Sequence, residues 1–195
     1  FNTLNGIYEN NFSNLPDAHK QLVGKIGKEN SLFYGGVDNN KMHKHNLLPP
    51  YVLNWFESIF RHYLKFNKIY EYKLSLNSVW INEMKAGEYN PIHIHQGSLY
   101  TGLSSVMILK LPKDMGPEYA RPDAPTNGKL QIIGSSNGQF VKSDYSPNAN
   151  ERDFYIFPYD MRHCVYPHTN PNAIRRTLAA NMDVEYNPVS SRAAI

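Results

Sequence analysis

The sequence has almost no cysteine, no long apolar run and no large excess of either charge, and each of these absences disfavours a class of protein. Cys164 is its only cysteine, so no disulfide can form within the chain, and we expect a reducing, cytoplasmic location. No apolar run approaches the length of a membrane-spanning helix. Neither sign of charge dominates, because 20 basic side chains face 17 acidic ones and leave a net charge of +3. This balance disfavours a polycationic protein that binds nucleic acid.

The sequence does contain enough apolar material for one folded domain. Its 195 residues are 41% hydrophobic and 13% aromatic, which excludes a disordered tail and allows a sizeable core. We expect a single domain over residues 1–195, with a helical lead-in over 1–69 and a β-rich core over 70–187. Residue 1 is Phe rather than Met. We therefore expect a trimmed chain, in which a preceding targeting segment would not be visible.

Helical patterns are confined to the first third of the chain. Pro16 followed by Leu22, Val23 and Ile26 at helical spacing predicts a short helix. Residues 31–50 contain Gly, Asn and Pro clusters and predict a loop. The basic stretch Lys41–His45 within it is interpreted as solvated, with contact to nucleic acid or an anionic substrate as the alternative. A broad apolar stripe then predicts a stronger helix over 51–66.

From residue 70 onward the apolar period changes to two. Alternation over 72–82 is typical of a strand. Further strands are expected at Ser104–Leu111, Lys129–Ile133, Gln139–Lys142, Phe154–Phe157 and Arg175–Val184. Turn residues separate these segments and no helical pattern intervenes. The sequence therefore predicts a mainly β, antiparallel sandwich or barrel with supporting N-terminal helices.

Three histidines are candidate metal ligands. His93 and His95 are two residues apart, so on a strand both imidazoles would point to one face. His163 follows the expected strand 154–157 through a turn that contains proline, and it could complete a set of three ligands. Neutral imidazole suits Fe, Zn, Cu or Ni, and three facial ligands leave positions open for small molecules. The alternative for each is an ordinary surface, turn or core histidine.

Arg175 is the candidate anion-binding residue. Alternation places Arg175, Thr177 and Asn181 on one face of the last strand and Arg176 on the other. A buried guanidinium needs an anionic partner, and a carboxylate ligand held with help from the Thr177 hydroxyl would supply one. An ion pair with an acidic side chain is the alternative. A shift of one residue in register would exchange Arg175 and Arg176.

Six short motifs occur in order between residues 78 and 186. They are Trp80-Ile-Asn82, Asn90-Pro-Ile-His93-Ile-His95-Gln-Gly97, Leu109-Lys-Leu-Pro112, Gly128-Lys-Leu130, Phe157-Pro158 with His163-Cys-Val-Tyr-Pro167, and Arg175-x-Thr177 with Asn181. In this combination the chain resembles the small iron(II)/2-oxoglutarate-dependent oxygenases of phage and bacterial type, which are related to the prolyl hydroxylases. For a phage protein, the expected location would be the host cytoplasm.

The resemblance implies a double-stranded β-helix, a jelly-roll or cupin-like barrel, with Fe(II) at one mouth. It implies that His93 is the proximal iron ligand and His163 the distal one. Arg175, with Thr177 beside it, would hold the far carboxylate of 2-oxoglutarate. Asn82 is a candidate polar contact to the cosubstrate, and Lys110 a candidate second cation. The implied activity is hydroxylation of a C–H bond with O2, releasing succinate and CO2.

The sequence departs from the family at the third ligand. The family pattern is His-x-Asp/Glu, and His95 stands where the carboxylate is expected. We therefore expect His93, His95 and His163 to form a neutral site that holds Fe(II) less tightly. An alternative makes His95 the proximal ligand with Gly97 in the carboxylate position, as in halogenating members. Asp160, three residues before His163, is a further candidate.

The substrate is the least determined part of the prediction. A peptidyl, prolyl-type substrate is favoured, a small molecule is the alternative, and specificity is expected around Lys41–His45 and in the loop Asp114–Asn127. Two rival classes stay open. One is a cupin-like metal protein that does not use 2-oxoglutarate. The other is a structural or binding protein without activity.

Overall fold

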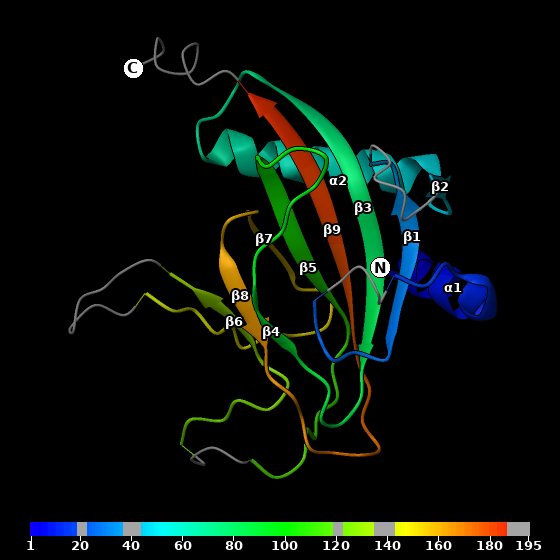
Figure 1. Cartoon of the computed structure of the whole chain (residues 1–195), viewed down its shortest axis with the longest axis vertical. Helices are drawn as coiled ribbons and strands as arrows, with labels where there is room; N and C mark the ends of the chain where they lie inside the picture. Colours follow the sequence, from blue (N-terminus) through cyan, green and yellow to red (C-terminus); the bar gives the residue numbers. More distant parts are fainter. Residues whose placement is uncertain (19–22, 37–43, 119–122, 135–142, 187–195) are drawn as a thin grey trace.

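The computed structural model describes residues 1–18, 23–36, 44–118, 123–134 and 143–186 (Figure 1). The helices in these ranges are α1 (Asn2–Asn11) and α2 (Pro50–Phe66), and a 3-10 turn covers Phe12–Asn14. The strands are β1 (Lys28–Tyr34), β2 (His45–Asn46), β3 (Tyr72–Met84), β4 (Asn90–His93), β5 (Gly102–Lys110), β6 (Leu130–Ile133), β7 (Phe154–Pro158), β8 (Arg162–Val165) and β9 (Arg175–Tyr186).

Two antiparallel sheets form the body of the protein. The larger sheet has the order β2-β1-β3-β9-β5-β7 and the smaller one the order β4-β8-β6. Neighbouring strands are widely separated in sequence, as in the pairing of β3 with β9. Figure 1 shows the long strands β3, β9 and β5 side by side, with the small sheet to one side of them. The predicted mainly β, antiparallel architecture is confirmed.

Alternation along the central strands gives the larger sheet two different faces. Val79 and Ile81 on β3, with Leu178 and Ala180 on β9, belong to the core that α1 and α2 cover. The residues between them point to the opposite face. A second core lies there, and its buried members are Ile26, Met84, Val106, Ile108, Leu130, Phe157 and Val165. One face of the sheet therefore provides stability, and the other is available for polar side chains.

Helix α2 confirms the helix predicted over 51–66. Its buried residues Val52, Phe56, Phe60 and Leu64 recur every four residues and form one apolar stripe. Pro50 occupies the first turn, where its fixed backbone angle suits a helix and its missing N–H removes no hydrogen bond. Neither α-helix in the described residues is long and apolar enough to cross a membrane.

The prediction of a helix after Pro16 is wrong for the described residues 16–18 and 23–27, which are not helical, whereas Leu22 lies outside the described residues. The first helix is α1, and Leu15 is extended, as is common for a residue that precedes proline. Asp17 and Lys25 instead form isolated β-bridges with Asn30 and Tyr89. The helical spacing in this segment did not predict the structure because these tertiary backbone contacts outweigh weak local preference.

The prediction of a loop over 31–50 is also wrong in part. Residues 28–34 form β1, which pairs with the central strand β3 of the larger sheet. The short strand β2, which includes His45, then pairs with β1. Pairing with β3 buries this segment, although its own sequence contains too few alternating apolar residues to predict a strand. The predicted strand Gln139–Lys142 lies outside the described residues, as does most of the Lys41–His45 stretch.

Phe56 provides a test of the helix–sheet core. We expect Phe56→Ala to lower the free energy of unfolding by about 3–5 kcal/mol, because its fully buried ring (0% exposed) would leave a cavity. Phe66 is the matched control on the same helix, since its ring is 81% exposed. Phe66→Ala should change the unfolding free energy by less than about 0.5 kcal/mol in urea denaturation. Equal effects of the two substitutions would contradict this packing.

Candidate active site

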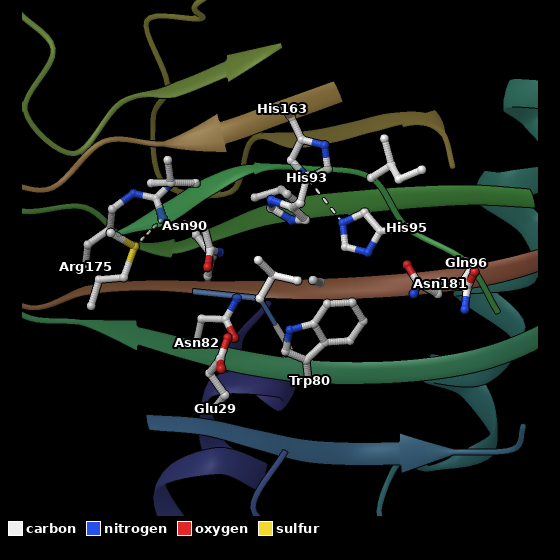
Figure 2. Close-up of a pocket in the computed structure, with 17 residues that line it drawn as sticks. Glu29, Trp80, Asn82, Asn90, His93, His95, Gln96, His163, Arg175 and Asn181 are labelled. Carbon is white, nitrogen blue, oxygen red and sulfur yellow. Dashed lines mark hydrogen bonds between the residues drawn. The ribbon is translucent and has the colours of Figure 1, made fainter. Parts of the chain in front are cut away.

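A cavity of about 280 Å³ lies between the larger sheet and the strands β4 and β8 (Figure 2). Strands β3 and β9 form its floor, and β1 adds one residue at the side. The predicted site residues that line it are Asn82, His93, His95, His163, Arg175 and Thr177. The fold therefore brings all six together, from four segments that are distant in sequence.

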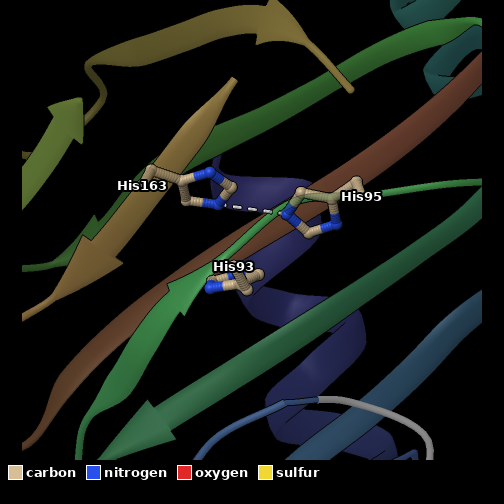
Figure 3. Close-up of side chains that lie close together, drawn as sticks. All are labelled: His93, His95 and His163. Carbon is tan, nitrogen blue, oxygen red and sulfur yellow. Dashed lines mark hydrogen bonds between the residues drawn. The ribbon is translucent and has the colours of Figure 1, made fainter. Parts of the chain in front are cut away.

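The three histidines converge on one point (Figure 3). His93 ends β4, and its backbone is paired directly with that of His163 on β8. His95 lies two residues beyond β4, and its Nε2 atom is 3.1 Å from Nε2 of His163. One ring nitrogen from each histidine lies within 4.8 Å of the other two. Two imidazoles that bind one ion at about 2.1 Å have nitrogens roughly 3 Å apart, so this spacing suits a metal ion.

Backbone carbonyls fix the orientation of two of the rings. His93 Nδ1 is 2.7 Å from the Pro91 carbonyl oxygen, and His163 Nδ1 is 2.9 Å from the Met161 carbonyl oxygen. A carbonyl oxygen can only accept, so each Nδ1 carries the hydrogen. The lone pair is therefore on Nε2, and that of His163 faces His95. This arrangement is the usual one around histidines that bind metals.

The electrostatics of the cluster keep all three rings neutral. Burial lowers the pKa of His93. Burial and the two neighbouring histidines lower the pKa of His95 to about 2, and burial and His93 lower that of His163 to about 4. Near neutral pH the rings therefore offer lone pairs and carry no positive charge. The donor set fits a divalent ion that accepts imidazole.

A buried network holds the backbone beside His95. The His95 N–H donates to the carbonyl of Tyr159 at 2.9 Å, and the Tyr159 hydroxyl donates to Asp183 at 3.1 Å. Asp183 also accepts from the backbone N–H of Ser98 at 3.0 Å. Gly97 packs so closely against Asp183 that no Cβ could fit there. The sequence analysis missed Asp183 and Tyr159, because their role depends on contacts between β9, β7 and the loop after β4.

Arg175 lies at the other end of the cavity. Only 2% of the residue is exposed, and burial lowers its pKa to about 10. Among the described residues its Nε atom has no hydrogen-bond partner, and the guanidinium donates only a weak hydrogen bond, to the Met84 sulfur at 3.8 Å. Thr177 and Asn82 lie alongside on paired strands, and Asn82 Oδ1 also has no partner. An unpartnered buried guanidinium marks a place for an anion.

The alternative between the two arginines is resolved by their contacts. Arg176 lies on the opposite face of β9, where it forms ion pairs with Glu83 at 2.8 Å and Glu9 at 2.9 Å. It is therefore not available to a ligand in the cavity. Lys110 is exposed and does not line the cavity, which contradicts its suggested role as a second cation. Asp160 is exposed too and does not belong to the histidine cluster.

Glu29 is a residue of the cavity that the sequence analysis missed. It lies on β1 directly opposite Asn82 of β3, and 2% of it is exposed. Burial raises its pKa to about 8, with a further contribution from the charges of Asp17 and Glu88. No local signal could reveal it, because residues 1–30 were expected to be a lead-in with a short helix, and the position of Glu29 depends on the pairing of β1 with β3.

Glu29 makes the stability of the ligand-free protein depend on pH. The folded protein retains a proton that an unfolded chain releases as the pH rises from about 4.5 to 8, so stability is lost over this window. We expect Glu29→Gln to be more stable than the original protein at pH 8, on the order of a few kcal/mol, and the difference to vanish near pH 4.5. Urea denaturation at both pH values measures it, and a constant difference would contradict the burial of a titrating carboxyl.

Several solved structures have a similar fold. An oxidoreductase of the 2OG-Fe(II) oxygenase family from Burkholderia pseudomallei is 14% identical, with a TM-score of 0.59 over 93% of this chain and 76% of that one. A prolyl hydroxylase from Trichoplax adhaerens, in complex with a peptide fragment of the hypoxia inducible factor oxygen degradation domain, is 13% identical, with a TM-score of 0.53 over 97% and 78%. A Pseudomonas putida prolyl-4-hydroxylase is 12% identical, with a TM-score of 0.51 over 93% and 84%.

The family match is more specific than these likenesses. No curated protein matches the chain. The model of a family described as "Putative 2OG-Fe(II) oxygenase" matches residues 78–181, which is more than half of the sequence and contains every predicted site residue. The structural likenesses agree with the jelly-roll fold expected from the resemblance. The chain therefore belongs to the 2OG-Fe(II) oxygenases, enzymes that use Fe(II), 2-oxoglutarate and O2.

Proposed function

We propose that this oxygenase hydroxylates a C–H bond of a peptidyl or small-molecule substrate and converts 2-oxoglutarate to succinate and CO2. His93, His95 and His163 bind the iron, and Arg175, Thr177 and Asn82 bind the cosubstrate. One observation carries this assignment. A single cavity has three neutral imidazoles at one end and a fully buried, unpartnered guanidinium at the other.

Some residues of the site bind the iron or the cosubstrate, and others orient the residues that bind. When bound, Fe(II) and 2-oxoglutarate supply the oxidation chemistry that no side chain can perform. The carbonyls of Pro91 and Met161 hold the Nδ1 protons of His93 and His163, which keeps the Nε2 lone pairs free for the ion. Arg175 pairs with the far carboxylate of the cosubstrate, which also removes the cost of burying an unpaired cation.

Two rivals have less support. A cupin-like metal protein without 2-oxoglutarate would leave the buried Arg175 without a partner. A halogenase-like pairing with Gly97 in the carboxylate position leaves no role for His93, whose free Nε2 faces the same point as the other two rings. The choice of a peptidyl substrate draws support from the prolyl hydroxylases of similar fold, one of them with a bound peptide.

An anaerobic titration tests the assignment of iron and cosubstrate. We expect Fe(II) and then 2-oxoglutarate to give a visible charge-transfer band that saturates near one equivalent. His93→Ala should abolish the band, because a site with two histidine ligands holds the ion weakly. Arg175→Ala should weaken 2-oxoglutarate binding by roughly 10- to 100-fold, since a charge-assisted pair contributes about 1.5–3 kcal/mol.

Matched controls separate these effects from general damage. His62 and Arg61 are exposed on α2, far in sequence from the cavity residues, and their alanine variants should give the same band as the original protein. If Fe(II) binds and no band follows, the role of Arg175 is wrong. If Fe(II) does not bind at all, the three histidines are not an iron site.

His95 is tested by returning the family residue to its position. His95→Asp restores the family pattern and adds a negative charge at the ion, so we expect Fe(II) affinity to rise by roughly tenfold or more. His95→Ala should lower it. Fe(II) titration monitored by the same band with saturating 2-oxoglutarate compares the two. Equal affinities in the original protein and in both variants would show that His95 is not a ligand.

A further inference from the structure

Glu29 has no part in the proposed function, although its carboxyl group lies in the same cavity. It comes from β1, the strand next to β3 on the side away from β9. Figure 2 shows the side chain beside Asn82, at the edge of the cavity opposite the histidines. Arg175 and Thr177 are on β9, so the cosubstrate site and Glu29 flank β3 from opposite sides.

The carboxyl group of Glu29 has no partner within the described residues. None of their side chains forms an ion pair with it, and no N–H or O–H donates a hydrogen bond to it. Its cross-strand neighbour Asn82 has an unpartnered Oδ1 atom. Glu29 and Asn82 therefore present acceptor oxygens to the cavity that accept no hydrogen bond from another described residue. Buried acceptors of this kind are usually satisfied; in the ligand-free cavity a proton held by Glu29 can serve one of these oxygens, and a bound donor can serve both groups.

The cosubstrate is a poor match for this pair of acceptors. At neutral pH 2-oxoglutarate carries two carboxylates and has no N–H or O–H to donate, so it gives neither acceptor a hydrogen bond and favours only the neutral form of Glu29. Arg175 already provides the cationic partner for its far end. The remaining component of the reaction is the molecule that becomes hydroxylated. The acceptor oxygens of Glu29 and Asn82 favour a ligand with hydrogen-bond donors, and a carboxylate binds a positively charged donor most strongly.

Resting on the proposed function, we propose that the substrate carries a protonated nitrogen, an ammonium or guanidinium, and that Glu29 binds it with the help of Asn82 Oδ1, which leaves the Asn82 Nδ2 group for the cosubstrate. The substrate class is therefore a basic amine, either free or as the side chain of a peptide. Glu29 is a specificity-determining residue and does not touch the iron.

Binding of such a cation should release protons. The charged groups that act on Glu29 are Asp17 and Glu88, which favour its neutral form, and Arg175 lies in the same cavity. At pH 7 the empty site therefore holds most of its Glu29 protonated. An ion pair with the substrate would convert it to the carboxylate and release up to one proton per complex.

The experiment compares cationic probes with neutral counterparts of the same shape. The protein is loaded with Zn(II) and 2-oxoglutarate to prevent turnover and is titrated calorimetrically at pH 7. The blocked probes are Nα-acetyl-lysine and Nα-acetyl-arginine methylamides, with the norleucine and citrulline analogues as neutral counterparts. Free lysine and arginine distinguish a free from a peptidyl source. Each titration is repeated in two buffers of different ionisation heat to count released protons.

We expect at least one cation to bind tenfold or more tightly than its neutral counterpart, with proton release. Glu29→Gln keeps the shape of the side chain and removes its charge, so it should abolish both the preference and the proton release. The matched control Glu185→Gln removes a charge from an exposed ion pair with Lys73 and should change neither. No preference for any cation in the original protein, or a preference that survives Glu29→Gln, overturns the inference.

The charge-transfer band separates this inference from the proposed function. We expect Glu29→Gln to give the same Fe(II)/2-oxoglutarate band and cosubstrate affinity as the original protein. If the original protein gives no charge-transfer band with Fe(II) and 2-oxoglutarate, the proposed function is wrong. If the original protein gives the band but Glu29→Gln weakens 2-oxoglutarate binding and leaves probe binding unchanged, Glu29 serves the cosubstrate and the inference is wrong.

Discussion

The antiparallel pairing of β3 with β9 is the constraint on which the site depends. Because side chains alternate along both strands, the register that pairs Asn82 with Thr177 and Met84 with Arg175 decides which residues face the cavity. A shift by one residue would turn Arg176 inward and direct Arg175 to the α1 side. The ion pairs of Arg176 with Glu83 and Glu9 on that side oppose such a shift. The contacts on the α1 side of the sheet therefore stabilise the register of the face that lines the cavity.

Burial of charge without a partner gives the cavity its chemical character. Arg175 and Glu29 are each about 2% exposed, and neither forms an ion pair with another described residue, an arrangement that costs folding energy unless a ligand completes it. The histidines avoid that cost by remaining neutral, since burial lowers the pKa of all three. Both of these residues line the cavity. This distribution is typical of a binding site.

The parts of the structure that could be predicted from the sequence are those with a local signal. The apolar stripe of α2, the alternation of β3 and β9, and the spacing of His93, His95 and His163 are all local patterns, and the family resemblance joined them into one site. Glu29, Asp183 and Tyr159 could not be found in this way. The position of each depends on contacts with a strand or loop that is distant in sequence. Strand β1 itself forms through its pairing with β3. Long-range pairing also explains why the described residues 16–18 and 23–27 do not form the expected helix.

The replacement of a carboxylate by His95 changes the charge balance of the whole cavity. In the family pattern the ligand carboxylate and the cosubstrate's two carboxylates offset the iron and the arginine. With His95 in that position, iron, 2-oxoglutarate and Arg175 together would leave one positive charge in a buried space. That excess lowers part of the cost of ionising Glu29, whereas burial and the charges of Asp17 and Glu88 keep its carboxyl group protonated until a cation binds. The negative charge of the family's ligand carboxylate would then be carried by Glu29 on β1. There it can bind a cationic substrate without weakening the iron's attraction for the cosubstrate.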